Sequence, residues 1–202
     1  MHRFDQEYDG IFRLRVPFGN IYTSVFLILA DRPILVDCAT TAEDVDSVIL
    51  PALEQMGYKL SDLQRLVLTH SHGDHAGGLG RVLELAPEIE VIRGEVRLLQ
   101  DGLSTYPLAG HSADSIGILD ENQGILLSGD ALQGAGVDKY RCNVKFPEEY
   151  LKTLERIKED ERIEHILFSH EYEPWYTDRV DGRVQVLACL DECPKYMKKN
   201  TA

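Results

Sequence analysis

The sequence predicts a mixed α/β domain, on three observations. Short apolar runs with strand-like composition occur in two groups along the chain, and each group is followed by segments with helical periodicity. The residues are 44% hydrophobic and 27% charged, as in an ordinary globular protein. A chain of 202 residues can bury a substantial core, so we expect one domain over residues 1–202.

Five strands and two helices are predicted in the first half of the chain. The first helix, over residues 41–55, is capped by Thr40 or Thr41 and ends at Gly57. Pro51 lies inside its apolar pattern and should kink the helix or begin a new segment. The predicted strands are Ile11–Val16, Thr23–Leu29, Ile34–Val36, Leu66–Leu68 and Glu88–Arg93, and the second helix is Gly78–Leu85.

The second half of the chain repeats this organisation. Two helices are predicted, at Pro147–Lys158 and Asp181–Cys193. Cys189 and Cys193 are four residues apart on the second of them, so we interpret both as thiols that face the core. The predicted strands are Leu103–Leu108, Ser115–Leu119 and Gly124–Leu127, and the inner face of the first helix is predicted to carry Tyr150, Leu151, Leu154 and Ile157.

Charge and composition disfavour several classes of partner. The formal charge is −13, and lysine or arginine clusters only in the short tail of Lys195, Lys198 and Lys199, which disfavours nucleic acid. The longest fully apolar stretch, Val25–Ala30, is too short to cross a bilayer. The N-terminus lacks a hydrophobic signal segment, and the four cysteines form no framework. We therefore expect a cytoplasmic protein with a small-molecule substrate and no membrane partner, and homo-oligomer formation stays open.

A cluster of candidate metal ligands follows the predicted strand at residues 66–68. The run His70-Ser71-His72-Gly73-Asp74-His75 places four candidate ligands within six residues. Side chains two apart in an extended segment point the same way, so His70 and His72 can hold one ion together. Gly73 lets the backbone turn without steric cost, so that Asp74 and His75 can face a second ion. The alternative is a polar loop of surface histidines.

The types of ligand in this run indicate the metal. Imidazole and carboxylate without thiolate favour Zn²⁺ in a catalytic site, while iron and manganese accept the same ligands. Three further candidates stand near strand ends: His111 before one predicted strand, Asp130 after the next, and His170 at the end of an apolar run at 165–169. Taken alone, His111 and His170 would be a loop and a structural histidine, and Asp130 a turn residue.

The whole pattern resembles the metallo-β-lactamase superfamily over roughly residues 10–172, and within it the branch of glyoxalase II and the lactonases. Thr69–Gly78 (THSHGDHAGG) is similar to the family's T-H-x-H-x-D-H-x-G-G signature. Ala109–Ser115 (AGHSADS) resembles its P-G-H-[ST]-x-G-S segment, and Leu127–Leu132 (LSGDAL) its [FL]-x-G-D-x-L segment. Residues 168–170 (FSH) stand where the family usually has P-G-H.

The resemblance implies both a fold and a set of ligands. The expected fold is a four-layer αββα sandwich, in which two sheets pack face to face with helices outside. Two divalent ions are expected, with His70, His72 and His111 on one, Asp74, His75 and His170 on the other, and Asp130 bridging both.

Several positions near these motifs bear on the site. Asp37 matches a family position that orients a metal-bound group, although a plain strand-end turn is the alternative. Ala109, Asp114 and Ser169 depart from the family pattern, and Asp114 could touch the metal site or the substrate. The side chains that flank the last ligands, and that could line a pocket or simply pack, are Tyr140, Arg141, Tyr172 and Trp175.

Such a site predicts a hydrolase. Two divalent ions about 3.5–4 Å apart would share a bridging water and lower its pKa, so that hydroxide is available at neutral pH. Asp74 could orient that water and accept its proton. We expect hydrolysis of an ester-like bond of a small molecule, namely a thioester, a lactone or a phosphoester.

Two other functions compete with hydrolysis. The persulfide dioxygenases resemble this sequence at Gly129–Leu132 and bind a single iron, which here would take His70 or His72, His111 and Asp130. The third hypothesis is a metal-binding partner protein with an unused pocket. Other branches fit less well, because true β-lactamases commonly lack the aspartate at 130 and flavodiiron proteins have glutamate in place of His72.

Overall fold

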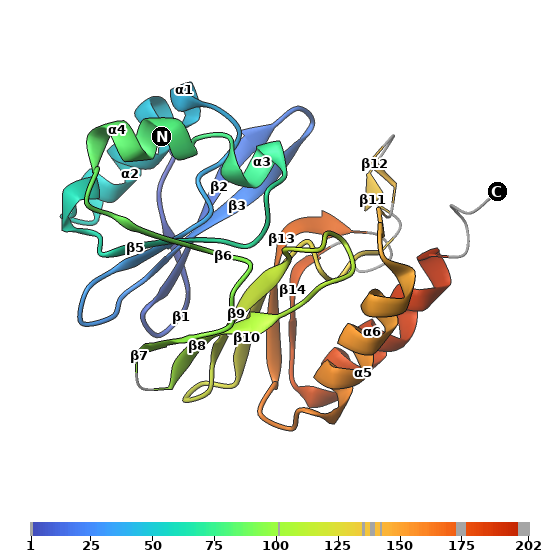
Figure 1. The fold of residues 1–202 in the computed structure, drawn as a ribbon. Coiled ribbons are helices and arrows are strands. Elements are labelled where there is room, and N and C mark those ends of the chain that lie inside the picture. Colours follow the sequence, from blue (N-terminus) through green and yellow to red (C-terminus); the bar gives the residue numbers. More distant parts are fainter. Residues whose placement is uncertain are drawn as a thin grey trace. The chain divides into compact units, whose positions relative to one another are not determined.

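The computed structural model describes residues 2–100, 102–134, 136–137, 140–141, 143–172 and 177–197, with backbone alone at 136–137, 140–141 and 172. The chain divides into two compact units, the N-terminal unit over residues 1–93 and the C-terminal unit over residues 94–202. Each unit has its own six-stranded sheet (Figure 1). Each also has its own hydrophobic core.

The sheet of the N-terminal unit has the order β1-β2-β3-β4-β5-β6. Its first four strands are antiparallel neighbours, while β4, β5 and β6 run parallel. Parallel strands need crossover connections, and helices occupy both crossovers. The strands are β1 (Asp5–Tyr8), β2 (Ile11–Phe18), β3 (Ile21–Ile28), β4 (Ile34–Val36), β5 (Arg65–Leu68) and β6 (Glu90–Arg93).

The helix predicted at residues 41–55 is divided into three segments. Thr41 begins it with a capping box, because its backbone N–H donates to Asp44 and its hydroxyl accepts from the Asp44 N–H. A π-helical segment then leads to a new helix with Pro51 in its first turn, which confirms that the proline begins a new segment. The helical elements of this unit are α1 (Ala42–Asp44), η1 (Val45–Ile49), α2 (Leu50–Gln55), η2 (Leu60–Asp62), α3 (Gly73–Ala76) and α4 (Leu79–Leu85).

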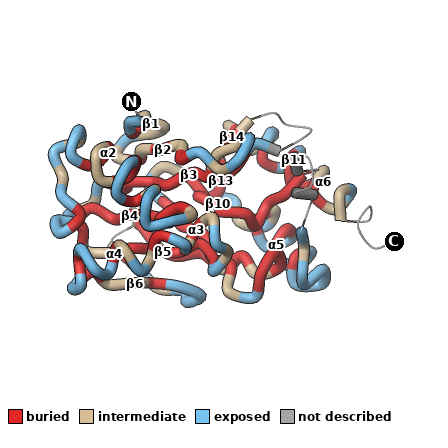
Figure 2. The backbone as a smooth tube through the Cα atoms, turned by 90° about the horizontal axis from the view of Figure 1, so that it is seen from above, coloured by how far each residue is buried: buried red, intermediate tan, exposed pale blue. Residues whose placement is uncertain are grey.

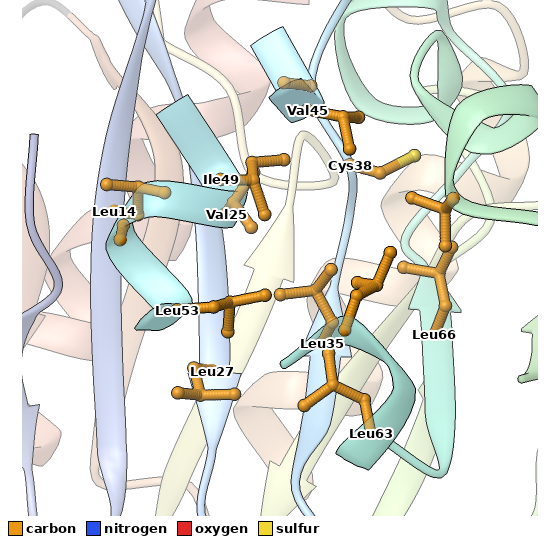
Figure 3. Close-up of a cluster of buried hydrophobic side chains, with 14 of the residues drawn as sticks. Leu14, Val25, Leu27, Leu35, Cys38, Val45, Ile49, Leu53, Leu63 and Leu66 are labelled. Atoms are coloured by element: carbon orange, nitrogen blue, oxygen red, sulfur yellow. The ribbon is translucent and has the colours of Figure 1, made fainter. Parts of the chain in front are cut away.

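The core of the N-terminal unit lies between these helices and one face of the sheet. Figure 3 shows Ile49 and Leu53 pointing from the helical segments toward Val25, Leu27 and Leu35 on the strands. All five side chains are fully shielded from solvent. Packing rather than helix propensity therefore holds these short helices in place.

The sheet of the C-terminal unit has the order β14-β13-β10-β9-β8-β7. Every neighbouring pair is antiparallel except β10 and β13, which run parallel with a helix in their crossover. Strand β10 is buried along its whole length (Figure 2). The strands are β7 (Leu98–Gln100), β8 (Leu103–Pro107), β9 (Ile116–Asp120), β10 (Ile125–Gly129), β13 (His165–Tyr172) and β14 (Thr177–Asp181), with a small pair β11 (Gly136–Val137) and β12 (Tyr140–Arg141).

Two helices, α5 (Pro147–Glu159) and α6 (Arg183–Met197), cover one face of this sheet (Figure 1). The inner face of α5 differs from the prediction at one position. Leu151 is 44% exposed, and Thr153 is buried in its place with its hydroxyl donating to Ala109 O. Leu151 follows Tyr150 by one residue, which turns it about 100° away from the buried stripe. On α6, Cys189 and Cys193 are both buried, as predicted.

The strands that the sequence analysis did not find are short or polar. β1 and β14 are edge strands whose sequences, DQEY and TDRVD, contain no apolar run. Edge strands of this kind are protected by charge and leave little hydrophobic signal. Among the described residues, none of the helices has both the length and the apolar content needed to span a bilayer.

Candidate metal centre

The histidine run of the N-terminal unit follows β5 directly and enters helix α3. His72 is the N-terminal cap residue of α3, so Asp74 and His75 lie on its single helical turn. Gly73 has an ordinary backbone conformation and would accommodate a Cβ atom without contact. The explanation of the turn by the freedom of glycine is therefore wrong: the start of a helix bends the chain at this point.

The four predicted ligands of this unit lie close together. The His70 ring centroid is 4.6 Å from that of His72 and 4.2 Å from that of His75. His75 Nε2 lies 3.4 Å from Asp74 Oδ2, and the Thr23 hydroxyl donates to the same oxygen at 3.4 Å. His70 and His75 are buried, whereas His72 and Asp74 are partly exposed.

Asp37 contacts one of these ligands, His75, and the neighbouring Thr69 from behind. Its carboxylate accepts hydrogen bonds from the Thr69 N–H at 2.7 Å and the Thr69 hydroxyl at 2.8 Å, and lies 2.7 Å from His75 Nδ1. A proton on Nδ1 satisfies this last contact and leaves the lone pair of His75 on Nε2. Asp37 has φ of +62°, an uncommon conformation for a residue other than glycine. This geometry fits the orienting role better than a plain turn.

Thr69 extends the same arrangement to His70. Because the Thr69 hydroxyl donates to Asp37, its oxygen is left to accept from His70 Nδ1, which lies 3.1 Å away. The lone pair of His70 is then also on Nε2. Hydrogen bonds of this kind behind histidine fix the ring and raise its basicity as a metal ligand.

Two glycines let the histidine run dock on the segment after β4. A Cβ atom on Gly77 would lie 1.8 Å from Thr40 O, and one on Gly78 would lie 2.2 Å from Cys38 O. Cys38 in turn donates its N–H to His75 O at 2.8 Å. Burial raises the pKa of the Cys38 thiol to about 12, so this thiol stays protonated and serves as packing.

The three predicted ligands of the C-terminal unit come together from distant parts of the sequence. Asp130 Oδ1 lies 3.3 Å from His170 Nε2, and Asp130 Oδ2 lies 3.8 Å from His111 Nε2. All three side chains are buried. Asp130 follows β10 and His170 lies in β13, and these neighbouring strands run parallel, so both side chains reach the same edge of the sheet.

Two residues behind His111 were not found by the sequence analysis. His111 Nδ1 lies 2.6 Å from Asn143 O and 2.9 Å from Gln133 Nε2. Gln133 is buried, and its Oε1 accepts from the Asn143 N–H at 2.7 Å. A lone glutamine three residues after an aspartate gives no signal in the sequence, and the contact appears only in three dimensions.

The remaining positions singled out in the sequence are less closely tied to the ligands. Asp114 accepts a hydrogen bond from the Ser112 hydroxyl at 2.7 Å, which steadies the loop after His111. Its contact with a metal or a substrate stays a prediction. Trp175 lies outside the described residues, as do the side chains of Tyr140, Arg141 and Tyr172.

The donor set in each unit fits divalent cations. The N-terminal unit offers three imidazoles and one carboxylate, and the C-terminal unit two imidazoles and one carboxylate. Nitrogen and carboxylate oxygen without thiolate suit Zn²⁺, Fe²⁺ or Mn²⁺. Three of the five rings have Nδ1 next to an oxygen that can accept its proton: His70 with Thr69, His75 with Asp37 and His111 with Asn143.

A family model and curated relatives match parts of the chain. Residues 19–98 match the model of the metallo-beta-lactamase superfamily. The chain is 35% identical over 80 residues to "Probable metallo-hydrolase YqjP" of Bacillus subtilis (strain 168), which covers 40% of this chain and 24% of that protein. It is 25% identical over 138 residues to "Hydroxyacylglutathione hydrolase" of Vibrio campbellii, covering 60% of this chain and 53% of that protein. The matches thus span about half or less of these relatives.

Solved structures match almost the whole chain. A metallo-beta-lactamase family protein of Thermus thermophilus has a TM-score of 0.73 at 17% identity, covering 96% of this chain and 81% of the other. Rubredoxin oxygen:oxidoreductase of Desulfovibrio gigas has a TM-score of 0.75 at 16% identity, covering 99% of this chain and 63% of the other. With two sheets and flanking helices in a mixed α/β chain, these matches confirm the predicted fold class.

Proposed function

We propose that this chain, which has the metallo-β-lactamase fold and matches that superfamily's model over residues 19–98, is a metal-dependent hydrolase. The observation that carries the proposal is that three of the predicted histidine ligands turn Nε2 toward a predicted carboxylate ligand. His75 Nε2 lies 3.4 Å from Asp74, and Asp130 lies 3.3 Å from His170 Nε2 and 3.8 Å from His111 Nε2. The hydrolase names of the relatives support it.

The proposed centre is binuclear. One divalent ion, which we propose to be zinc, would be held by His70, His72 and His111. The other would be held by Asp74, His75 and His170, with Asp130 shared. The identity of the metals, their number and the assignment of each ligand are all part of the proposal.

The roles of the chain's own residues follow from this assignment. When bound, the ions would lower the pKa of a coordinated water toward neutrality and polarise a carbonyl or phosphoryl oxygen of the substrate. Asp74 would orient the water and accept its proton, and the Thr23 hydroxyl would hold the Asp74 carboxylate in position. Asp37 and Thr69 would keep the rings of His70 and His75 in the ligating tautomer.

The proposed substrate is a small molecule with an ester-like bond: a thioester, a lactone or a phosphoester. The formal charge of −13 supports a small molecule over nucleic acid. A single domain over residues 1–202 and a cytoplasmic location are part of the same proposal.

The second candidate is a mono-iron dioxygenase that resembles the persulfide dioxygenases. It rests on the segment Gly129–Leu132, and the likeness to the fold of an oxygen:oxidoreductase leaves it open. His72 disfavours a different kind of oxygen chemistry, that of a di-iron site, because the flavodiiron branch has glutamate at this position. Metal content separates the two candidates.

The test combines metal analysis with a substrate screen. We expect the purified protein to contain about two zinc ions per chain and to hydrolyse at least one of a panel of generic esters, lactones, thioesters and phosphodiesters. Asp74→Asn should abolish that turnover. One iron per chain with oxygen uptake on a persulfide would favour the dioxygenase, and full metal loading with no turnover would leave the metal-binding partner protein.

A further inference from the structure

We propose that Gln133 is a positioning residue that holds His111 in its ligating orientation by anchoring the peptide of Asn143. The inference rests on the proposed metal centre, in which His111 is the third histidine. Gln133 lies beyond the superfamily motifs that identify the ligands, in the segment that follows Asp130.

The side chain of Gln133 is buried and faces both the imidazole and the peptide. Its Oε1 accepts from the Asn143 N–H at 2.7 Å, and its Nε2 lies 2.9 Å from His111 Nδ1. The carbonyl oxygen of the same Asn143 residue lies 2.6 Å from His111 Nδ1. The amide group of Gln133 thus contacts both the His111 ring and Asn143, the residue whose carbonyl faces that ring.

These contacts determine where the proton of His111 resides. The Asn143 carbonyl can only accept, so the 2.6 Å contact requires a proton on Nδ1. The amide of Gln133 cannot be turned over, because its NH₂ group would then face the Asn143 N–H. With the proton on Nδ1, the Gln133 Nε2 at 2.9 Å makes no hydrogen bond to the ring, so Gln133 acts on His111 through the Asn143 carbonyl. His111 is left with its lone pair on Nε2, the atom that lies 3.8 Å from Asp130.

Helix α5 fixes Gln133 itself. The Gln133 N–H donates to the Tyr150 hydroxyl at 3.2 Å. The same helix presses on the loop before His111, since a Cβ atom on Gly110 would lie 2.6 Å from Tyr150 Cα. The Phe146 N–H also donates to Gly110 O at 2.9 Å. Helix α5 therefore holds both the backbone of Gln133 and the loop before His111, so a change in the Gln133 side chain should be transmitted to His111.

The test uses two substitutions with opposite expectations. Gln133→Met keeps the length of the side chain and removes the acceptor for the Asn143 N–H, so zinc affinity should fall about 10- to 100-fold, as for other residues behind a ligating histidine. Gln133→Glu keeps that acceptor and offers His111 Nδ1–H a second one. Its zinc affinity should stay closer to the wild-type value than to that of Gln133→Met.

Two measurements distinguish positioning from general stability. Zinc affinity is measured by competition with a chromophoric chelator, and the ring tautomer of His111 by ¹⁵N NMR of the metal-free protein. We expect the Nδ1–H tautomer in wild type and a mixture of tautomers in Gln133→Met. The control is Gln123→Met, which removes the hydrogen bond to Asp120 at 2.8 Å and should change neither.

The outcomes separate this inference from the proposed function. Wild type with no bound zinc would overturn the proposed metal centre, while the tautomer measurement would still report on Gln133. Zinc bound by wild type, with unchanged affinity and unchanged tautomer in Gln133→Met, would overturn the positioning role alone. A lower melting temperature of Gln133→Met with both readouts unchanged would also overturn it, because Gln133 would then be only a packing residue.

Discussion

The two units support their candidate ligands in different ways. In the N-terminal unit, the four ligands lie within six residues, and the carboxylate of Asp37 stands behind them. In the C-terminal unit, the three ligands are spread over 60 positions, and uncharged groups of Gln133 and Asn143 stand behind His111. Hydrogen bonds to a charged partner are roughly twice as strong as neutral ones. We therefore expect the first set of ligands to be held more rigidly than the second.

The largest effect on the free energy of unfolding is expected where the histidine run packs against the backbone of residues 38–40. Gly77→Ala would place a methyl group 1.8 Å from Thr40 O, and overpacking of this kind should cost about 3 kcal/mol or more of unfolding free energy. The matched control is Gly80→Ala in helix α4, where a Cβ atom meets nothing within 4 Å. That substitution should stabilise the protein by about 0.4–1 kcal/mol. Urea denaturation measures both, and equal stability of the two variants would contradict the close docking.

The next largest effect concerns zinc affinity, and it compares the charged Asp37 behind His75 with the uncharged Gln133 behind His111. Asp37→Asn keeps the side-chain shape, but its NH₂ group cannot accept a hydrogen bond. One of the three groups that donate to Asp37 therefore loses its acceptor, and zinc affinity should fall about 10- to 100-fold or more. We expect a larger loss than for Gln133→Met, because the lost bonds are charge-assisted. Asp46→Asn, which weakens only an exposed ion pair with Arg81, is the control and should leave zinc affinity unchanged. A smaller loss for Asp37→Asn than for Gln133→Met would reverse the comparison.

How far the sequence predicts this molecule also differs between the two units. The motif at 70–75 could be read directly, because its ligands are contiguous and their spacing carries the geometry. Strand β4 has its predicted bounds, since a buried apolar run between turns has few alternatives. The support behind His111 could not be predicted, because Gln133 and Asn143 are distant from it in the sequence and reach it only in the folded unit.

The errors of the sequence analysis have physical causes. Hydrophobicity alone predicts Leu151 on the inner face of α5, whereas the buried position belongs to Thr153, whose hydroxyl donates to Ala109 O. The sequence suggests that Gly73 makes the turn after His72, but the start of helix α3 makes it. Edge strands β1 and β14 were missed because polar residues protect them.

The smallest effect concerns alkaline pH. Burial raises the pKa of Cys38 in the N-terminal unit from 9.0 to about 12, and that of Tyr106 in the C-terminal unit from 10.0 to about 12. Both folded pKa values lie above the unfolded ones, so the stability from each neutral group is complete below its unfolded pKa and is lost as pH rises toward 12. The free energy of unfolding should therefore decline less steeply above about pH 9 in Cys38→Ala than in wild type. In Tyr106→Phe the same difference should begin only above about pH 10.

Urea denaturation between pH 8 and pH 11 measures this difference. The tyrosine should give the weaker response over this range, because its unfolded pKa is the higher of the two. A wild-type slope in Cys38→Ala between pH 9 and pH 10 would show that the thiol is not buried as described.

The central claim is that the predicted ligands, His111 among them, bind two divalent ions. Its most direct test is the ratio of metal to protein in wild type and in His111→Ala, measured by plasma emission spectrometry after dialysis, with His165→Ala as control because its partner is Asp181. We predict about two divalent ions per chain in wild type and in the control, and a large loss of bound metal in His111→Ala. An unchanged ratio in His111→Ala would contradict the claim.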